Sequence, residues 1–131
     1  MEVDHVGIAV RNLAEATERW SLLLGGPEAP PEEVPAQKVR VVFLSAGASR
    51  VELLEPLTPD SPIAKFLDSR GEGFHHVAFH VPSVDRSLAE LKAAGRRVVD
   101  VHGRPGARGH RVGFAHPSAF GGVLVEFVES A

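Results

Sequence analysis

The chain contains an internal repeat, which limits its possible folds more than any other feature of the sequence. Residues 4–26 (DHVGIAVRNLAEATERWSLLLGG) align with residues 75–97 (HHVAFHVPSVDRSLAELKAAGRR) at an offset of 71, so that His5 falls on His76. A second match, at an offset of 74, places Glu52 on Glu126. Because two copies are too few for a solenoid, the repeat predicts two similar modules that pair into one structure.

The first copy has the pattern of a βαβββ unit. Residues 4–10 alternate between apolar and small or polar side chains, as in a half-buried strand. The helix that follows begins after Asn12, a candidate N-cap with Glu15 three residues later, and it ends at two consecutive glycines. Two further strands are expected over 39–47 and 49–57, joined by a turn that contains glycine.

The remaining segments complete the second copy. Residues 27–36, with four prolines, are expected to form a loop or edge structure, and Ser61 followed by Pro62 begins a short linking helix. The second copy is then expected to contain a strand over 75–81, a helix over 83–95, and strand-like segments over 96–101, 110–117 and 122–129.

Four polar residues occupy equivalent positions of the two copies: His5 and His76 on the first strands, Glu52 and Glu126 on the last. Valines and leucines or phenylalanine flank each glutamate, so both carboxylates should face away from the helices. A pseudo-two-fold axis would bring the four side chains toward one centre. Two imidazoles and two carboxylates suit a divalent Zn, Co, Ni or Mn ion.

The repeat and the order of strands and helices predict an α+β fold in a single domain over residues 1–131. Module one covers about 1–58, a linking helix 61–71, and module two about 73–131. The modules are expected to form one curved, mostly antiparallel sheet around the metal.

Two other histidines of the GFHHVAFHV segment are not expected to be ligands. His75 is out of phase with His76 and should face the other side of the sheet, where a strand-end hydrogen bond is the expected role. His80 shares a face with His76 but lies about 6–7 Å farther along the strand, which suits a pocket wall better than a ligand.

Composition excludes several classes of function. The chain has no cysteine, so no disulfide, thiolate nucleophile or Cys-based metal site can form. Its net charge is −3 and it has no block of basic residues, which argues against nucleic-acid binding. The apolar runs are too short for a membrane span, and a cytoplasmic protein is expected. Asn12 and Gln37 are the only residues of their types, a bias typical of thermophilic proteins.

The motifs resemble the vicinal oxygen chelate superfamily, in which paired βαβββ modules surround a metal. Within it, DHVGIAV, VELLEPLTPDSPIAKFL, GFHHVAFHV and FAHPSAFGGVLVEF are similar to segments of methylmalonyl-CoA epimerases. The resemblance implies ligation of a divalent ion by His5, Glu52, His76 and Glu126, the same four residues that the repeat indicates. It also implies a homodimer, an acyl-CoA substrate and epimerisation by α-proton transfer through a metal-stabilised enolate, with Glu126 as a catalytic base.

The sequence departs from the epimerase pattern at two places. Some epimerases have glutamine at the position of Glu52 and a second catalytic glutamate at the position of Val41, which cannot transfer a proton. We therefore expect Glu52 to act as the second base, as paired glutamates do in glyoxalase I; the alternative is that Glu52 is a ligand only. Many relatives also carry lysine where this chain has Ser118, in the segment HPSA.

Other functions stay open at this point. Glyoxalase I would use the same ligand set but needs a glutathione site, and a metal-free resistance module of the same fold needs no such ligands. A superfamily dioxygenase, with two histidines and one carboxylate, fits less well. The glycine-rich segment GRPGARGHR supplies Arg104, Arg108 and Arg111, which would contact coenzyme A phosphates or form a solvated hairpin.

Overall fold

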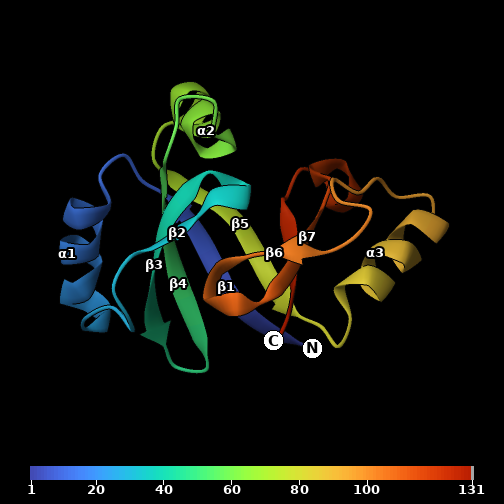
Figure 1. Cartoon of the computed structure of the whole chain (residues 1–131), viewed down its shortest axis with the longest axis horizontal. Helices are drawn as coiled ribbons and strands as arrows, with labels where there is room; N and C mark the ends of the chain where they lie inside the picture. The colour runs from blue at the N-terminus through green and yellow to red at the C-terminus, as the bar shows by residue number, and fades with distance from the viewer. Residues whose placement is uncertain (131) are drawn as a thin grey trace. The chain divides into compact units, whose positions relative to one another are not determined.

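The computed structural model describes residues 1–130, and these residues form two compact units (Figure 1). The N-terminal unit spans His5–His75. The C-terminal unit combines Met1–Asp4 with the chain from His76 onward. None of the helices formed by residues 1–130 has the length and apolar character that a membrane crossing requires.

The N-terminal unit holds a four-stranded sheet and two α-helices. Its sheet has the order β2-β3-β4-β1, in which β1 runs parallel to β4 and the other neighbours are antiparallel. Its elements are β1 (Glu2–Ala9, whose first three residues belong to the C-terminal unit), α1 (Leu13–Leu24), β2 (Glu32–Val34), the 3-10 turn η1 (Pro35–Gln37), β3 (Val39–Ala46), β4 (Ser49–Pro56) and α2 (Pro62–Arg70).

The C-terminal unit repeats this arrangement with one α-helix. Its strands have the order β5-β8-β7-β6, and β5 runs parallel to β8 while the other neighbours are antiparallel. Its elements are β5 (Gly73–His80, which begins in the N-terminal unit), α3 (Val84–Ala93), β6 (Arg104–Pro105), η2 (Ala107–Gly109), β7 (Arg111–Ala115), η3 (Pro117–Phe120) and β8 (Val125–Glu129). The predicted α+β class and the repeated βαβββ order are confirmed.

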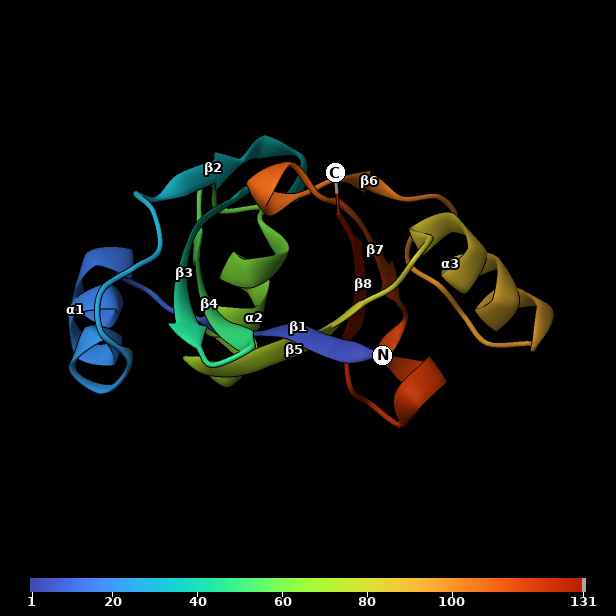
Figure 2. The ribbon, with the colours of Figure 1, turned by 90° about the horizontal axis from the view of Figure 1, so that it is seen from below.

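Each α-helix of the repeat packs on one face of its own sheet. In the N-terminal unit α1 contacts β3 and β4, and in the C-terminal unit α3 contacts β7 and β8 (Figure 2). The core residues alternate along the strands as predicted: Val51 and Leu53 pack beneath α1, and Val125 and Phe127 pack beneath α3. The side chains between them, including both predicted glutamates, therefore lie on the opposite face of each sheet.

The helix boundaries follow from capping residues that the sequence reveals. Asn12 Oδ1 accepts a hydrogen bond from the Glu15 amide at 3.0 Å, and Gly25, with φ of 80°, ends α1. Ser61 Oγ accepts from the Ile63 amide at 3.1 Å and precedes Pro62, the first residue of α2. Each predicted N-cap is confirmed.

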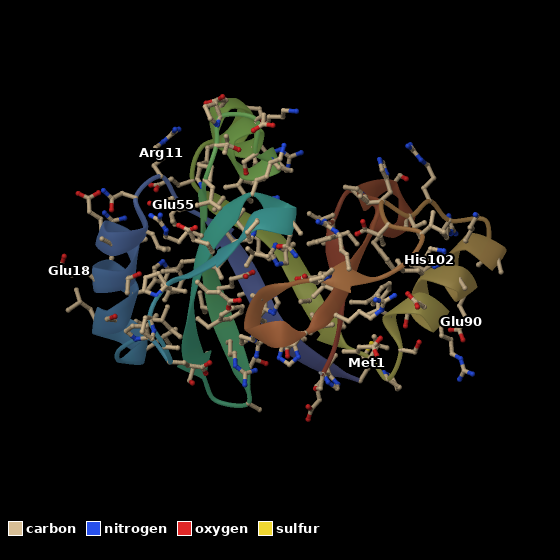
Figure 3. The ribbon with its side chains drawn as sticks, viewed as in Figure 1. Met1, Arg11, Glu18, Glu55, Glu90 and His102 are labelled. Carbon is tan, nitrogen blue, oxygen red and sulfur yellow. The ribbon has the colours of Figure 1, made fainter. Side chains whose placement is uncertain are left out.

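A glutamate near the end of each last strand provides a second cap that the sequence analysis did not identify. Glu55 Oε2 accepts a hydrogen bond from the Leu13 amide at 2.7 Å, and Glu129 Oε1 accepts one from the Val84 amide at 2.7 Å (Glu55 is labelled in Figure 3). Both carboxylates lie at a helix N-terminus, where the exposed amides and the helix dipole stabilise negative charge. The repeat thus extends to the strand–helix contacts.

The expected strand over 96–101 does not form. Only an isolated bridge joins Val98 to Ala115 there, and the short outer strand β6 lies at Arg104–Pro105 instead. The cause is Asp100, whose Oδ2 accepts the hydrogen bond from the Phe114 amide at 2.8 Å. This side chain takes the amide that a backbone carbonyl of a continuing strand would need.

Candidate functional site

The N-terminal unit places His5 beside Glu52 through the pairing of two parallel strands. Gly7 is the register partner of Glu52, and His5 lies two residues before Gly7 on the same face of β1. The distance from His5 Nε2 to Glu52 Oε1 is 3.2 Å, and the two residues are only 3% and 4% exposed. The unit therefore encloses an imidazole and a carboxylate in direct contact.

The C-terminal unit contains the equivalent pair. Ala78 is the register partner of Glu126, and His76 lies two residues before Ala78. His76 Nε2 is 3.2 Å from Glu126 Oε1, and these residues are 1% and 4% exposed. We call the face of each sheet that carries these side chains the pair face; the helix of the module covers the other face.

A phenylalanine supports each histidine on the pair face. Phe43 lies opposite Glu52 in the β3–β4 register, and its ring meets that of His5 edge-on at 5.4 Å between centroids. Phe114 lies opposite Glu126 and meets His76 edge-on at 5.7 Å. Neither ring was predicted from the sequence, although their offset of 71 is the same one that relates the two histidines.

The chemistry of the pairs fits ligation of a divalent cation. Each of the four side chains offers one ligand atom, an imidazole nitrogen or a carboxylate oxygen, and all four are buried. Two ligands that lie about 2.1 Å from one such ion are about 3.0–3.4 Å apart in octahedral or tetrahedral geometry. The 3.2 Å separation within each pair falls in this range. Buried ionisable groups of this kind are otherwise costly unless they are paired.

Comparison with known proteins identifies the family. The Glyoxalase/Bleomycin resistance protein/Dioxygenase superfamily matches residues 4–114. The mitochondrial methylmalonyl-CoA epimerase of Bos taurus is 38% identical over 98% of this chain and 74% of its own length. The ethylmalonyl-CoA/methylmalonyl-CoA epimerase of Cereibacter sphaeroides is 39% identical over 95% of this chain and 94% of its own length.

The chain belongs to the methylmalonyl-CoA epimerase family of this superfamily. A solved structure agrees with this assignment along the whole chain. A variant of the Streptomyces coelicolor methylmalonyl-CoA epimerase, in complex with 2-nitronate-propionyl-CoA, superimposes with a TM-score of 0.94 and 37% identity, covering 100% of this chain and 95% of that one. The resemblance predicted from the sequence motifs is therefore confirmed.

Within this family member, His75 and His80 contact residues other than the two glutamates. The ring of His75 meets Phe66 of α2 edge-on at 4.9 Å, so His75 takes part in helix packing. His80 Nε2 lies 2.9 Å from Ser130 Oγ at the end of the described chain.

The two departures from the epimerase pattern are also visible. Val41 is 1% exposed and lies on the pair face, two residues before Phe43, so an apolar side chain occupies that position. Ser118 belongs to the turn η3, where its amide donates to His116 Nδ1 at 3.1 Å and its hydroxyl lies 2.8 Å from the same nitrogen. The serine therefore closes the turn against His116.

Proposed function

We propose that this chain is a metal-dependent epimerase that interconverts the two epimers of methylmalonyl-CoA. The observation that carries the proposal is the duplicated pair of buried side chains, His5 with Glu52 and His76 with Glu126, each at 3.2 Å. Membership of the epimerase family supplies the substrate class: an acyl-CoA thioester with a carboxylate on its α-carbon.

The proposed ligand set consists of all four paired residues acting on one divalent cation, with Co, Mn, Ni and Zn as candidates. The mixed nitrogen and oxygen donors, their burial and their equivalence in the repeat support this set. When bound, the cation would supply a Lewis acid that stabilises negative charge developing on the oxygens of the substrate.

Glu126 is the proposed base that removes the α-proton. The α-carbon lies between a thioester carbonyl and a carboxylate, so loss of its proton gives a planar, resonance-stabilised carbanion. Inversion then needs a proton donor on the opposite side. Glu52 is the proposed donor because it is the repeat equivalent of Glu126 and, like it, is buried beside a histidine. The competing assignment makes Glu52 a ligand only.

The alternative functions fit less well. A glyoxalase I-like isomerase shares the ligand set, but the relatives from Bos taurus and Cereibacter sphaeroides, at 38% and 39% identity, are named as methylmalonyl-CoA epimerases. A metal-free resistance module has no need for two buried His–Glu pairs. The homodimer also remains a family-based proposal, which light scattering of the purified protein would test.

Isotope exchange tests the proposed function. Cobalt-loaded protein is incubated in deuterium oxide with (R)- or with (S)-methylmalonyl-CoA, and α-deuterium incorporation is followed together with loss of optical purity. We expect both to occur, to stop with a chelator and to return when metal is restored. Metal bound without exchange would contradict the substrate assignment, and hemithioacetal substrates would be assayed next. Exchange that persists without metal would contradict the metal dependence.

A further inference from the structure

We infer that Arg104 binds an anionic oxygen of the acyl-CoA substrate beside the His76–Glu126 pair, an inference that rests on the proposed function. The anion is either the carboxylate of the acyl group or a phosphate of coenzyme A. The carboxylate is planar and the phosphate is tetrahedral, and a guanidinium binds either group through two donors. The experiment below distinguishes these two sources.

The strand register places Arg104 on the pair face of the C-terminal unit. Arg104 is the partner of Val112 in the β6–β7 ladder, and Val112 is the partner of Val128. Val112 and Val128 form a small buried cluster with Ala78, the register partner of Glu126. Because register partners point to the same face, Arg104 lies in the row that contains Val128, and Val128 lies two residues after Glu126 on the same face of β8.

A chain of contacts joins Arg104 to the histidine of the pair. The Arg104 guanidinium lies over the Phe114 ring, 5.8 Å from its centre, and Phe114 in turn contacts His76 at 5.7 Å. Asp100 holds this arrangement from the side: its Oδ1 is 3.2 Å from Arg104 Nε, and its Oδ2 accepts the Phe114 amide. Arg104 is thus oriented before any ligand arrives, yet about a third of its side chain (32%) stays exposed.

The other two arginines of this segment are positioned differently. Arg111 lies on the helix face and makes two contacts with Asp85, at 2.9 and 3.0 Å. The Gly103 amide and then the Arg111 guanidinium hold the pKa of Asp85 below its usual value, as expected for a structural ion pair. Arg108 Nη2 lies 2.5 Å from Oδ2 of Asp4. Arg104 is therefore the arginine of this segment that the register assigns to the pair face.

The repeat makes the position of Arg104 informative. In the C-terminal unit, Arg104 pairs to Val112, which lies two residues before Phe114. In the N-terminal unit, Glu32 pairs in the same way to Val41, which lies two residues before Phe43. The equivalent positions thus carry opposite charges. Only the C-terminal module offers a cation there, which suits a substrate whose anionic groups are not symmetric about its α-carbon.

Steady-state kinetics of Arg104 variants test the inference. Arg104→Gln removes the charge, Arg104→Lys keeps it without the planar fork, and Arg111→Gln on the helix face is the matched control. We expect Arg104→Gln to raise the KM for methylmalonyl-CoA about 10- to 100-fold with kcat changed far less, since a charge-assisted hydrogen bond is lost in both ground and transition states. Arg104→Lys should retain part of the affinity, and Arg111→Gln should keep the wild-type KM.

A truncated substrate, methylmalonyl-pantetheine, identifies the anion because it keeps the acyl carboxylate and has no phosphate group. A KM defect that persists with this thioester assigns the acyl carboxylate, and a defect that disappears assigns a phosphate. Thermal unfolding and metal content establish that the variants are folded and loaded. A wild-type KM for Arg104→Gln, or for Arg104→Lys if the glutamine variant does not fold, would overturn this inference and leave the proposed function unaffected. Wild-type protein without exchange or epimerisation would overturn the proposed function and this inference with it.

Discussion

Glu126 lies beside His76 with only 3.2 Å between its Oε1 and the histidine Nε2, and both side chains are almost fully buried. A carboxylate in this position can serve as a ligand and as a base, but the two roles depend on different properties. Ligation needs an oxygen donor at this place, whereas proton transfer needs an ionisable group. Substitutions that keep the oxygen and remove the ionisation can therefore separate the roles.

Glu126→Gln should abolish epimerisation and the α-deuterium exchange of the epimer whose α-proton faces Glu126, while part of the metal affinity remains, because the amide keeps an oxygen donor but cannot accept the α-proton. His76→Ala should instead remove a proposed direct ligand. The cobalt affinity should therefore fall by more than the roughly 10- to 100-fold that follows loss of a residue that only contacts a ligand. Competition with a chelator measures the affinity, and NMR measures the exchange. An active Glu126→Gln protein would contradict the assignment of Glu126 as the base.

Glu52→Gln separates the two readings of the second glutamate. If Glu52 transfers a proton, this variant should lose racemisation but retain exchange from one epimer, since Glu126 can still remove and return a proton on its own side. Exchange of (R)- and (S)-substrate would then differ strongly. A metal-loaded Glu52→Gln protein that epimerises at the wild-type rate would show that Glu52 is a ligand only.

The rings of Phe43 and Phe114 should increase the metal affinity of the two His–Glu pairs without taking part in proton transfer. Phe114→Leu and Phe43→Leu remove contacts to His76 and His5, and we expect each to weaken cobalt binding by about 2- to 10-fold, the value of one aromatic contact. Phe66→Leu removes the contact to His75 and serves as the control, with unchanged cobalt affinity. An equal loss in all three variants would indicate a general effect on packing.

Most of the fold could be predicted because each module follows local rules. The caps at Asn12 and Ser61 and the alternation around Glu52 and Glu126 depend on near neighbours in the sequence, and the structure agrees with them. The repeat carried the prediction further, since it related His5 to His76 without any knowledge of the fold.

The features that were missed depend on distant side chains. The strand expected over 96–101 fails because Asp100 binds the Phe114 amide, a contact that no local pattern reveals. The caps at Glu55 and Glu129 were missed for the same reason. Both residues belong to predicted strands, but their carboxylates cap helices that begin about 40 residues earlier in the chain. Arg104 could not be separated from Arg108 and Arg111 until the register of β6 was known.

The two glutamate caps predict a measurable loss of stability. Glu129→Ala leaves the Val84 amide at the start of α3 without its acceptor, and Glu55→Ala does the same to Leu13 at the start of α1. Each should lower the free energy of unfolding by about 1–2 kcal/mol. Glu90→Ala, on the exposed side of α3, is the control (Figure 3). Urea unfolding of the metal-free proteins gives the comparison, and losses no larger than that of Glu90→Ala would contradict the cap assignment.

Gly113 should be intolerant of even one added carbon, because α3 packs directly on it. A Cβ at Gly113 would lie 2.8 Å from Leu88 Cδ1 and 2.9 Å from Val84 Cγ1, and both of these residues are fully buried. Gly113→Ala is expected to destabilise the protein by about 1–3 kcal/mol through overpacking. Gly26→Ala, where no atom lies within 4 Å of the added carbon, should be nearly neutral. Leu88→Ala in the Gly113→Ala background should cost less than Leu88→Ala alone, since the added methyl group would occupy part of the cavity. Fully additive losses would show that the helix moves away from β7 as a unit.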